Sequence, residues 1–403
     1  MPELNFTSRI PIAKGWSEDK KYCVTRSDGT KYLLRISAAE RYENRKELFS
    51  MLQKVERLGV PMCRPVELGL CEEGVYTLHS WIDGEEAEEV IPTLGKDEQY
   101  ALGLEASRIL KKIHSVPAPA AQEDWYTRFG RKTDVKIQKY KENPHHFEGD
   151  DLIIGYIEAN RGLLKGRPQC FQHGDYHVGN MMIENKKSIP ESAKVENRTV
   201  TAGIGAVRPE DRTVTAGIGA VRPEDRTVTA GIDAVRPEDR TVTAGIGAVR
   251  PEDRTVTAGI GAVRAEDKTV TAGIGAVRAE DKTVTADVDA AKAENNKLVI
   301  IDFDRFDFGD PWEEFNRIVW CAAASPAFAS GRLDGYFGGE PPLAFFKLLA
   351  LYIASNALSS IYWAPQFGQG ELDTMLQQAQ DILSWYDGMQ NPVPSWYHSR
   401  ISL

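Results

Sequence analysis

Hydrophobic and polar positions follow two different spacings along this chain, and the change of spacing divides it into a short beginning and a longer remainder. Near the N-terminus, short apolar or alternating runs are typical of strands, and one longer run with apolar residues on a single face is typical of a helix. The expected strands are residues 22–26, 32–37 and 75–81, and the expected helix is residues 39–58. We therefore predict a small β-rich lobe that contains one helix.

The remainder of the chain is mostly helical by the same criterion. The expected helices are residues 98–114, 152–164, 312–322, 343–364 and 371–386, and the expected strands are residues 180–184 and 297–302, paired as a short hairpin. The helix at 343–364 is long enough to cross a membrane, but Lys347, Asn356 and three serines interrupt its apolar character. We interpret it as a buried helix of a globular domain.

A tandem repeat lies between the two strands of the expected hairpin. The unit Thr-Val-Thr-Ala-Gly-Ile-Gly-Ala-Val-Arg-Pro-Glu-Asp-Arg begins at Thr199 and recurs every 14 residues as far as Asn296, with a degenerate last copy. Alternate apolar positions such as Val200 and Ile204 favour an extended chain, and Arg-Pro-Glu-Asp favours a turn. Because glycines and small side chains give each copy little to bury, a loose loop and a regular β array, either a meander or a small solenoid, both remain open.

Composition and charge narrow the class of protein. Hydrophobic residues make up 42% of the chain, which allows a sizeable core, and the formal net charge is -10, which argues against a nucleic-acid binder. The acidic balance suits a cationic substrate, although it also serves solubility. The five cysteines are scattered without a Cys-x-x-Cys pair, and the N-terminus lacks the pattern of a signal peptide. We therefore expect a cytoplasmic protein with reduced thiols and no membrane association.

The strongest chemical signal is the segment His173-Gly-Asp175-Tyr-His177-Val-Gly-Asn180. Phosphoryl transfer needs an acceptor hydroxyl held in line, a carboxylate to take its proton, and metal ions to neutralise the phosphates. Asp175 is expected to orient the hydroxyl and accept its proton, and Asn180 is expected to reach Mg²⁺. The catalytic loop of protein kinases has the same spacing from Asp to Asn.

A second signal lies beyond the repeats, where the apolar run Leu298-Val-Ile-Ile ends in Asp302-Phe-Asp304. A buried strand that ends in a carboxylate is typical of a Mg²⁺ site at the edge of a cleft. We expect Asp302 to bind the metal, and Asp304 either to add to it or to fix the loop. One such aspartate is often only a turn residue, but the pairing with the preceding motif favours a catalytic site.

Together these motifs resemble those of the aminoglycoside phosphotransferase family, which includes choline and macrolide kinases and has a protein-kinase-like fold. The resemblance covers nearly the whole chain outside residues 188–296. Removing that segment brings Asn180 and Asp302 to the short separation that the family shows. The resemblance implies a catalytic Asp175, Mg²⁺ at Asn180 and Asp302, and ATP as phosphoryl donor. Glu314 stands where the family motif has Asp, so no chemical role is assigned to it.

The resemblance also places the nucleotide site in the first lobe. In protein kinases the corresponding strand ends in a lysine that binds the phosphates, and Arg35 holds that place here. Arginine keeps the charge and can bind phosphate bidentately. Glu47 on the next helix is its expected ion-pair partner. Residues 13–17 are the expected nucleotide loop, and Ser80 and Ile82 are expected to frame the hinge that meets adenine.

We therefore predict an α+β, bilobal, protein-kinase-like fold with a small β-rich N-terminal lobe, a mainly helical C-terminal lobe, and a repeat insertion of loose or β character. The expected segments are 1–83, the nucleotide-binding lobe; 84–187, with the catalytic loop; 188–296, the repeats; and 297–403, with the metal-binding segment.

The predicted function is transfer of the γ-phosphoryl group of ATP, with Mg²⁺, to a hydroxyl of a small molecule. An aminoglycoside-like antibiotic is the first acceptor class, and choline, thioribose, homoserine and macrolides are alternatives that the same motifs serve. A non-catalytic nucleotide binder and an interaction protein whose repeats are the functional part also remain open. A protein partner of the repeats is unknown, and neither nucleic acid nor a membrane is expected as a partner.

Overall fold

The computed structural model describes residues 5–13, 18–185 and 296–398, together with eight strands between residues 213 and 286. Two compact units make up the chain, Met1–Glu184 with Leu298–Leu403, and Asn185–Lys297. The first unit holds the residues with chemical signals, and the second holds the repeats.

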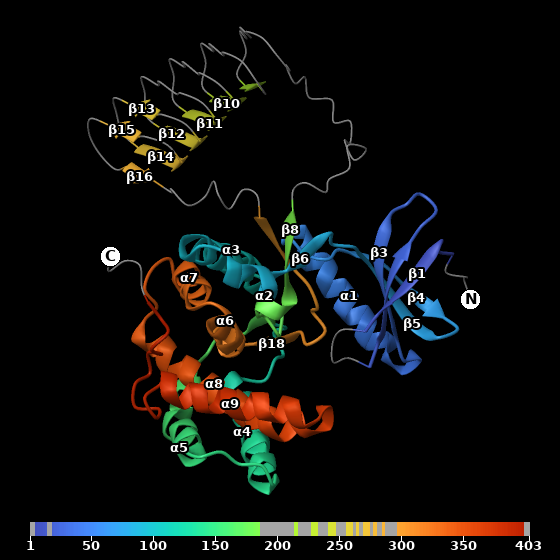
Figure 1. Cartoon of the computed structure of the whole chain (residues 1–403), viewed down its shortest axis with the longest axis vertical. Helices are drawn as coiled ribbons and strands as arrows, with labels where there is room; N and C mark the ends of the chain where they lie inside the picture. The colour runs from blue at the N-terminus through green and yellow to red at the C-terminus, as the bar shows by residue number, and fades with distance from the viewer. Residues whose placement is uncertain are drawn as a thin grey trace. The chain divides into compact units, whose positions relative to one another are not determined.

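The first unit begins with an antiparallel sheet of five strands in the order β1-β2-β3-β5-β4, with helix α1 beside it (Figure 1). The bounds are β1 Ser8–Ile12, β2 Lys20–Thr25, β3 Lys31–Ser37, α1 Tyr42–Arg57, β4 Pro65–Cys71 and β5 Gly74–Ser80. Apolar side chains at alternate positions of β3, such as Leu34 and Ile36, pack with Val24, Tyr76 and Leu78 into a small core. This confirms the predicted β-rich lobe and adds β1 and β4, which the sequence pattern did not indicate.

The rest of this unit is mainly helical, as predicted. The helices are α2 Ala87–Val90, α3 Lys96–His114, α4 Trp125–Glu142, α5 Asp150–Asn160, α6 Ile318–Ala324, α7 Pro326–Phe337, α8 Leu343–Trp363 and α9 Gln369–Trp385. The expected helix 312–322 is instead a 3-10 turn, Glu313–Arg317, followed by α6. Helices α4 and α7 were not expected. In α4 the buried side chains recur at helical spacing, Trp125, Phe129, Thr133, Ile137 and Tyr140, but the many charges between them weaken that pattern.

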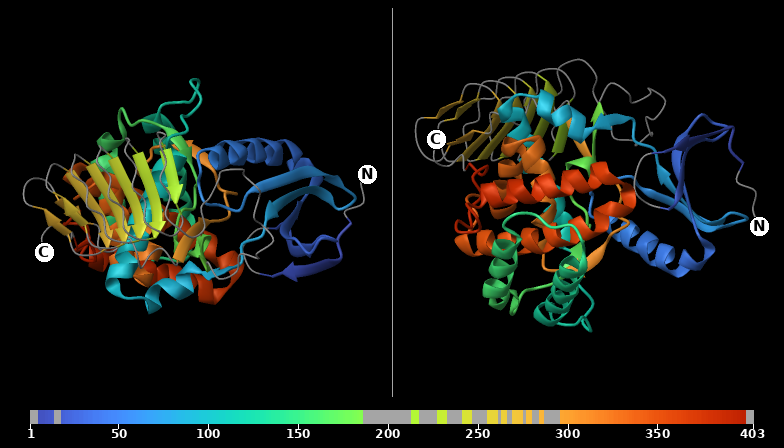
Figure 2. Two further views of the ribbon diagram at one scale, coloured as in Figure 1. Left: turned by 90° about the horizontal axis from the view of Figure 1, so that it is seen from above. Right: turned by 60° about the horizontal axis from the view of Figure 1, so that its bottom comes forward.

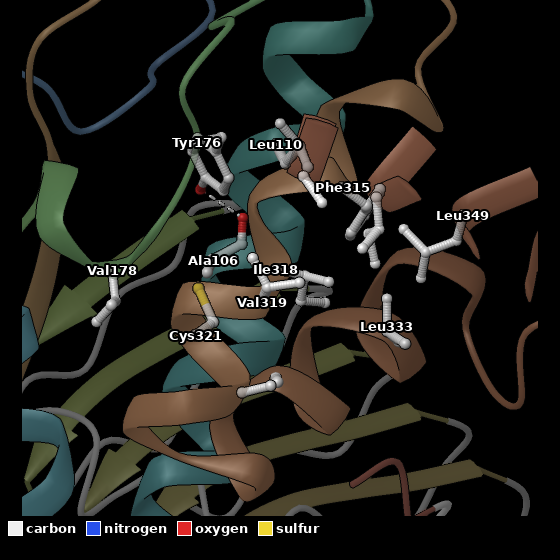
Figure 3. Packing of buried hydrophobic residues seen from close by; sticks show 14 of the residues in the cluster. Ala106, Leu110, Tyr176, Val178, Phe315, Ile318, Val319, Cys321, Leu333 and Leu349 are labelled. Carbon is white, nitrogen blue, oxygen red and sulfur yellow. Dashed lines mark hydrogen bonds between the residues drawn. The ribbon is translucent and has the colours of Figure 1, made fainter. Parts of the chain in front are cut away.

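The helical core encloses α8 and extends to the catalytic segment. Within α8, residues 348–358 are buried without interruption. Figure 3 shows how Tyr176 points from the catalytic segment toward α3, where its hydroxyl donates a hydrogen bond of 2.7 Å to the carbonyl oxygen of Ala106. Ile318 and Cys321 of α6 belong to the same cluster of buried side chains. The residue next to Asp175 is thus anchored in the core.

Among the described residues, one helix is long and apolar enough to cross a membrane. It is α8 with its 3-10 extension, Leu343–Phe367, and 83% of its most apolar window is buried inside the molecule. Its apolar surface therefore packs against the protein's own side chains.

Two short sheets carry the catalytic segments. In one, β17 Asn296–Ile300, β8 Met181–Asn185 and β6 Gly84–Glu86 lie in the order β17-β8-β6. In the other, β7 Cys170–Gln172 pairs antiparallel with β18 Asp307–Gly309. Because the loops after β7 and β17 start at neighbouring sheets, residues far apart in the sequence converge there.

In the repeat unit the described strands form a regular β array. Successive copies pair in parallel and in register, so that Thr227 lies opposite Thr241 and Thr255 opposite Thr269. The left view of Figure 2 shows the strands of the larger sheet side by side. Parallel pairing excludes a meander, whose neighbouring strands run antiparallel.

The repeat strands form two sheets. The larger sheet, in the order β16-β14-β12-β11-β10-β9, consists of Val284–Ala286, Thr269–Ile274, Thr255–Ile260, Thr241–Ile246, Thr227–Ile232 and Thr213–Ala216. The smaller sheet consists of β13 Val263–Ala265 and β15 Val277–Ala279.

Candidate active site

The catalytic segment is held from behind by buried polar groups. A carboxylate of Glu314 accepts hydrogen bonds from the backbone N–H groups of His173, at 2.7 Å, and Gly174, at 2.9 Å. Gly174 has a φ of 83°, and a Cβ there would overlap the backbone of Arg305. Only glycine therefore lets the two loops approach this closely. Glu314, which received no role from the sequence, braces the catalytic loop.

His173 links the two loops through its ring. Its Nδ1 accepts from the backbone N–H of Asp175 at 3.2 Å, and its Nε2 lies 3.0 Å from the carbonyl oxygen of Ile301. An acceptor at Nδ1 requires the proton at Nε2, which can then donate to that carbonyl. The side chain is fully buried, so it fixes the distance between the loops that carry Asp175 and Asp302.

Asp175 lies among cationic side chains. Its carboxylate is 3.1 Å from Nε of Arg317 and 3.6 Å from Nε of Arg305. Burial raises the pKa of this carboxyl, but the positive charges of Arg317 and Arg305 help to outweigh it and hold the pKa below its usual range. Asp175 is therefore ionised near neutral pH, as a residue that orients a hydroxyl must be.

His177 remains neutral beside this carboxylate. Burial lowers its pKa to about 4, despite the opposing effect of Asp175. Nδ1 accepts from the backbone N–H of Gly179 at 3.1 Å, so the proton sits on Nε2, 3.7 Å from the Asp175 carboxylate. His177 thus presents an N–H toward Asp175 and adds no charge.

Asn180 and Asp302, the predicted metal ligands, are brought together by one backbone contact. The N–H of Ile301 donates to the carbonyl oxygen of Asn180 at 3.0 Å, so Asp302 follows directly after the residue bonded to Asn180. The Asn180 amide in turn donates to the carbonyl oxygen of Asp175 at 2.9 Å. The three predicted residues of the catalytic centre therefore share one hydrogen-bonded frame.

Asp302 has an unusual backbone and a stabilised charge. Its φ is 61°, a backbone conformation that residues other than glycine rarely adopt. Burial raises the pKa of its carboxyl, while Arg35 and Lys21 lower it by more, so the pKa lies below its usual range. The carboxylate is 3.2 Å from Nη1 of Arg35 and 3.8 Å from Nζ of Lys21.

Arg35 belongs to a buried network of charges that the sequence did not predict. Its Nε donates to Asp19 at 2.7 Å, and another guanidinium nitrogen contacts Asp304. Arg45 of α1 joins the same two carboxylates, at 2.6 Å to Asp19 and 2.7 Å to Asp304. Arg35 and Arg45 therefore tie β3 and α1 to the loop that carries Asp302.

The pKa of Asp19 reports the strength of this network. Burial raises it, but Arg35 and Arg45 together hold it below the usual range. The side chain is 2% exposed. The network is therefore charged, paired and nearly closed to solvent, which is the condition under which buried ions are tolerated.

Glu47 does not reach Arg35. It lies exposed on α1, two positions after Arg45, and residues two apart on a helix point in different directions. Because Arg45 faces the network, Glu47 faces away from it. The expected ion pair between Arg35 and Glu47 is thus not the one formed; Asp19, Asp302 and Asp304 are the carboxylates at Arg35.

The expected hinge residues lie at the end of the first sheet. Ser80 is the last residue of β5, and its backbone N–H donates to the carbonyl oxygen of Arg64 at 2.9 Å, which occupies that donor. Ile82 lies in the link between β5 and β6. Most of the expected nucleotide loop, residues 14–17, lies outside the described part of the chain.

The donor set fits a Mg²⁺–nucleotide complex better than a metal cage. Across the described ranges, no group of three or more His, Cys, Asp or Glu side chains is placed to hold a metal ion by itself. Mg²⁺ in kinase sites is held by one or two carboxylates together with phosphate oxygens and waters. Asn180 and Asp302 supply oxygen atoms of that kind at the junction of the two loops, whereas the carboxylate oxygens of Asp304 pair with Arg35 and Arg45.

Several functional residues escaped the sequence pattern. Asp19 and Arg45 stand in segments that read as a loop and an ordinary amphipathic helix, and their importance arises only from contacts with Asp304, far along the chain. Arg305 and Arg317 follow the strand that leads to Asp302. Their closeness to Asp302 in the sequence was the signal that could have indicated them as site residues.

Part of the chain matches a known protein family. Residues 8–189 match the model described as phosphotransferase enzyme family. A solved structure of the GDP complex of an aminoglycoside 2′-phosphotransferase-IIIa mutant is similar, with a TM-score of 0.54 and 10% identity, covering 96% of this chain and 95% of that one. The GDP and kanamycin complex of a related enzyme gives 0.52 and 10% identity, with 95% of each chain covered.

A further structure extends the likeness to other acceptors. A choline/ethanolamine kinase family protein from Mesorhizobium loti gives a TM-score of 0.51 and 10% identity, covering 96% of this chain and 92% of that one. At such identities the likeness concerns the fold. A curated relative, the small ribosomal subunit protein uS9m of Mus musculus, is 26% identical over 94 residues, and the chain spans 23% of that protein's length.

The matched segment contains β2, β3 and the loop with Asp175 and Asn180, and the neighbouring structures share the two-lobed kinase-like fold. Residues 8–189 of this chain therefore match the phosphotransferase enzyme family, and the chain has the fold of solved aminoglycoside phosphotransferases and of a choline/ethanolamine kinase family protein.

Proposed function

We propose that the protein is an ATP-dependent kinase that transfers the γ-phosphoryl group to a hydroxyl of a small molecule. The observation that carries this proposal is the hydrogen-bonded frame of Asp175, Asn180 and Asp302, which is joined by the contact of Ile301 with Asn180. It brings a hydroxyl-orienting carboxylate beside two metal-ligating side chains, which is what phosphoryl transfer requires.

Each residue has a proposed task. Asp175 holds the acceptor hydroxyl in line and takes its proton; because its pKa is low, it acts mainly by orientation and receives the proton late in the reaction. Asn180 and Asp302 hold Mg²⁺, which when bound neutralises the charge on the phosphates. Arg35 keeps Asp302 and Asp304 in place. Ile82 lies where the link to the second lobe can meet the adenine of ATP.

The acceptor class is the least constrained part of the proposal. An aminoglycoside-like acceptor has support from neighbours whose solved complexes contain kanamycin or gentamicin. A less cationic metabolite is the second candidate, because Arg305 and Arg317 flank Asp175. These cations lessen the attraction between Asp175 and a polycation, whatever the net charge of the whole chain.

The proposal also concerns organisation and location. We take residues 188–296 as an insertion between the catalytic loop and the metal-binding strand, with 1–83 as nucleotide-binding lobe and 84–187 and 297–403 as the two parts of the second lobe. A cytoplasmic location fits the ATP requirement and the free cysteines.

The test is a coupled ADP-release assay of the purified full-length protein with Mg²⁺ and ATP. The acceptor panel comprises aminoglycosides, macrolides, choline, thioribose and homoserine, and the inactive control is Asp175→Ala. Acceptor-dependent ADP release that the control lacks supports a kinase. Equal ADP release by both proteins contradicts the proposal. The proposal is also contradicted if no acceptor causes ADP release and the protein does not bind MgATP.

A further inference from the structure

We propose that Lys21 on β2 is the cation that contacts the phosphates of the bound nucleotide. The strand position of Arg35 suggested that Arg35 has this role. This inference rests on the proposed kinase function and concerns one residue of its nucleotide site. The candidate ligand is the triphosphate of a Mg²⁺–nucleotide complex.

The register of the first sheet places Lys21 on the face that carries the site. Lys21 lies directly opposite Arg35 across the β2–β3 pair, and residues directly opposite in an antiparallel pair project to the same face. Lys20 therefore projects to the other face. There its Nζ pairs with Glu73 at 3.1 Å, and its side chain is 60% exposed, compared with 13% for Lys21.

Lys21 faces the proposed metal ligand but is not saturated by it. Its Nζ is 3.8 Å from the Asp302 carboxylate, which is an ion-pair distance and too long for a hydrogen bond. An ammonium group has three N–H donors. Within the described ranges Asp302 is the carboxylate paired with this group, so donors remain for a phosphate that approaches Asp302 through a metal ion.

Arg35 is placed differently. Its guanidinium contacts three carboxylates, Asp19, Asp302 and Asp304, and its side chain is 8% exposed. To bind phosphate bidentately it would have to give up part of this set, in which Asp19 is 2% exposed and would be left with uncompensated charge. Arg35 is thus a positioning residue, whereas the compact and partly exposed ammonium of Lys21 is suited to act as a point charge on a phosphate.

The connection that precedes Lys21 agrees with this role. β1 and β2 are antiparallel neighbours, and the expected nucleotide loop, residues 13–17, joins them. Lys21 is the second residue of β2, so it lies where that connection enters the sheet. Lys21 therefore stands at the entry of β2 and within ion-pair distance of Asp302.

The experiment compares Lys21→Met with the matched control Lys20→Met in the full-length protein. Binding of ATP and ADP with Mg²⁺ is measured by isothermal titration calorimetry, and folding is checked by circular dichroism and melting temperature. We expect Lys21→Met to bind MgATP at least about 10-fold more weakly, since a charge-assisted hydrogen bond is lost, and Lys20→Met to bind like the unmodified protein. Lys21→Arg should recover part of the affinity.

Kinetics give a second readout. With any acceptor that supports turnover, Lys21→Met should raise KM for ATP and leave KM for the acceptor unchanged. If Lys21→Met disturbs folding, Lys21→Gln replaces it, because that side chain keeps polarity while losing the charge.

The outcomes separate this inference from the proposed function. If the unmodified protein binds MgATP and Lys21→Met binds it equally well, the assignment of Lys21 is wrong and the kinase remains. Equal weakening by Lys20→Met and Lys21→Met also overturns it, because that result reports general charge rather than contact. If the unmodified protein binds no MgATP, the kinase function fails and the inference fails with it.

Discussion

The carboxylates of Asp304 and Asp175 both lie beside arginines, but the arginines differ in how exposed they are to solvent. Around Asp304, the side chains of Arg45, Asp19 and Arg35 are 1%, 2% and 8% exposed, and they form a closed network. Around Asp175, Arg317 and Arg305 are 19% and 47% exposed. The centre around Asp304, proposed to face the nucleotide, is therefore closed and ordered, whereas the centre around Asp175, proposed to face the acceptor, is more open.

This difference matches what each side has to bind. A nucleotide is the same molecule in every turnover, so a rigid network loses nothing on binding and pre-orients the metal ligands. The acceptor side has a half-exposed Arg305 over the ring of Trp363, at 5.9 Å, and such side chains can move when an acceptor approaches. Four substitutions or deletions can test this contrast.

Removal of the carboxylate of Asp175 should abolish turnover and leave nucleotide binding intact. Loss of an acid–base and positioning group typically costs about 10²–10⁴-fold in rate, whereas the nucleotide side does not depend on this residue. Asp175→Ala is measured for kcat and for MgATP affinity, with Asp175→Asn as the isosteric control. Near-normal turnover in purified Asp175→Ala would show that another residue holds the hydroxyl.

Breaking the closed network should destabilise the protein far more than breaking the open one. Arg45→Met leaves Asp19 and Asp304 with one buried cation fewer, and loss of a buried partner costs on the order of 3 kcal/mol. Arg305→Met removes a half-exposed charge and should cost less than about 1 kcal/mol. Urea denaturation of the two variants gives both free energies of unfolding. Equal losses would mean that the two centres do not differ in rigidity.

Mild acid should lower the free energy of unfolding of the protein through His177, which lies beside Asp175. Its pKa is about 4 in the folded protein and 6.5 as the ordinary value, so between these values the unfolded chain binds a proton that the folded protein does not. The contribution of neutral His177 to the free energy of unfolding is therefore fully present above about pH 6.5. It is lost as the pH decreases toward 4, by on the order of 1–3 kcal/mol.

The measurement compares the pH dependence of unfolding in His177→Asn and the unmodified protein. The variant should lose part of the slope between pH 6.5 and 4. His79, whose pKa burial also lowers to about 4, keeps the remaining slope and serves as an internal reference. An unchanged slope in His177→Asn would place the histidine in a solvated environment.

Neither centre should depend on the repeats, which gives the smallest expected effect. We expect a protein in which Lys187 is joined directly to Lys297 to keep its turnover and nearly its melting temperature. A loose loop of this length would cost about 2–3 kcal/mol in closure entropy, but the described repeat strands form their own compact unit. Loss of solubility or turnover would mean that the repeats contribute to the kinase unit.

The sequence indicated the candidate site residues that are close together along the chain. Asp175 and Asn180 share one loop, and Asp302 ends an apolar strand, so spacing and periodicity alone indicated them. The partners of Arg35 could not be found in this way, because Asp19 and Asp304 reach it through sheet register and loop packing. The interpretation chose Glu47 by charge on the following helix, but only the buried face of that helix reaches the site, and Arg45 occupies it.

The fold shows the same division. The β-rich first lobe followed from the spacing of apolar residues, and the buried helix at 343–364 followed from the length of its apolar run. Helix α7 was missed although Ser325 caps it and Pro326 begins it, because its interior is rich in small residues and gives little periodic signal. The residues that begin this helix were visible in the sequence, but no hydrophobic pattern after them indicated a helix.

The in-register pairing of the repeats has a consequence for the gene. Each strand of the larger sheet pairs with the equivalent residues one copy further on, so every interior copy occupies the same environment. When a DNA polymerase slips on such near-identical units, a whole copy is gained or lost and the reading frame is kept. Sheets with more or fewer strands would then have the same pairing at every step.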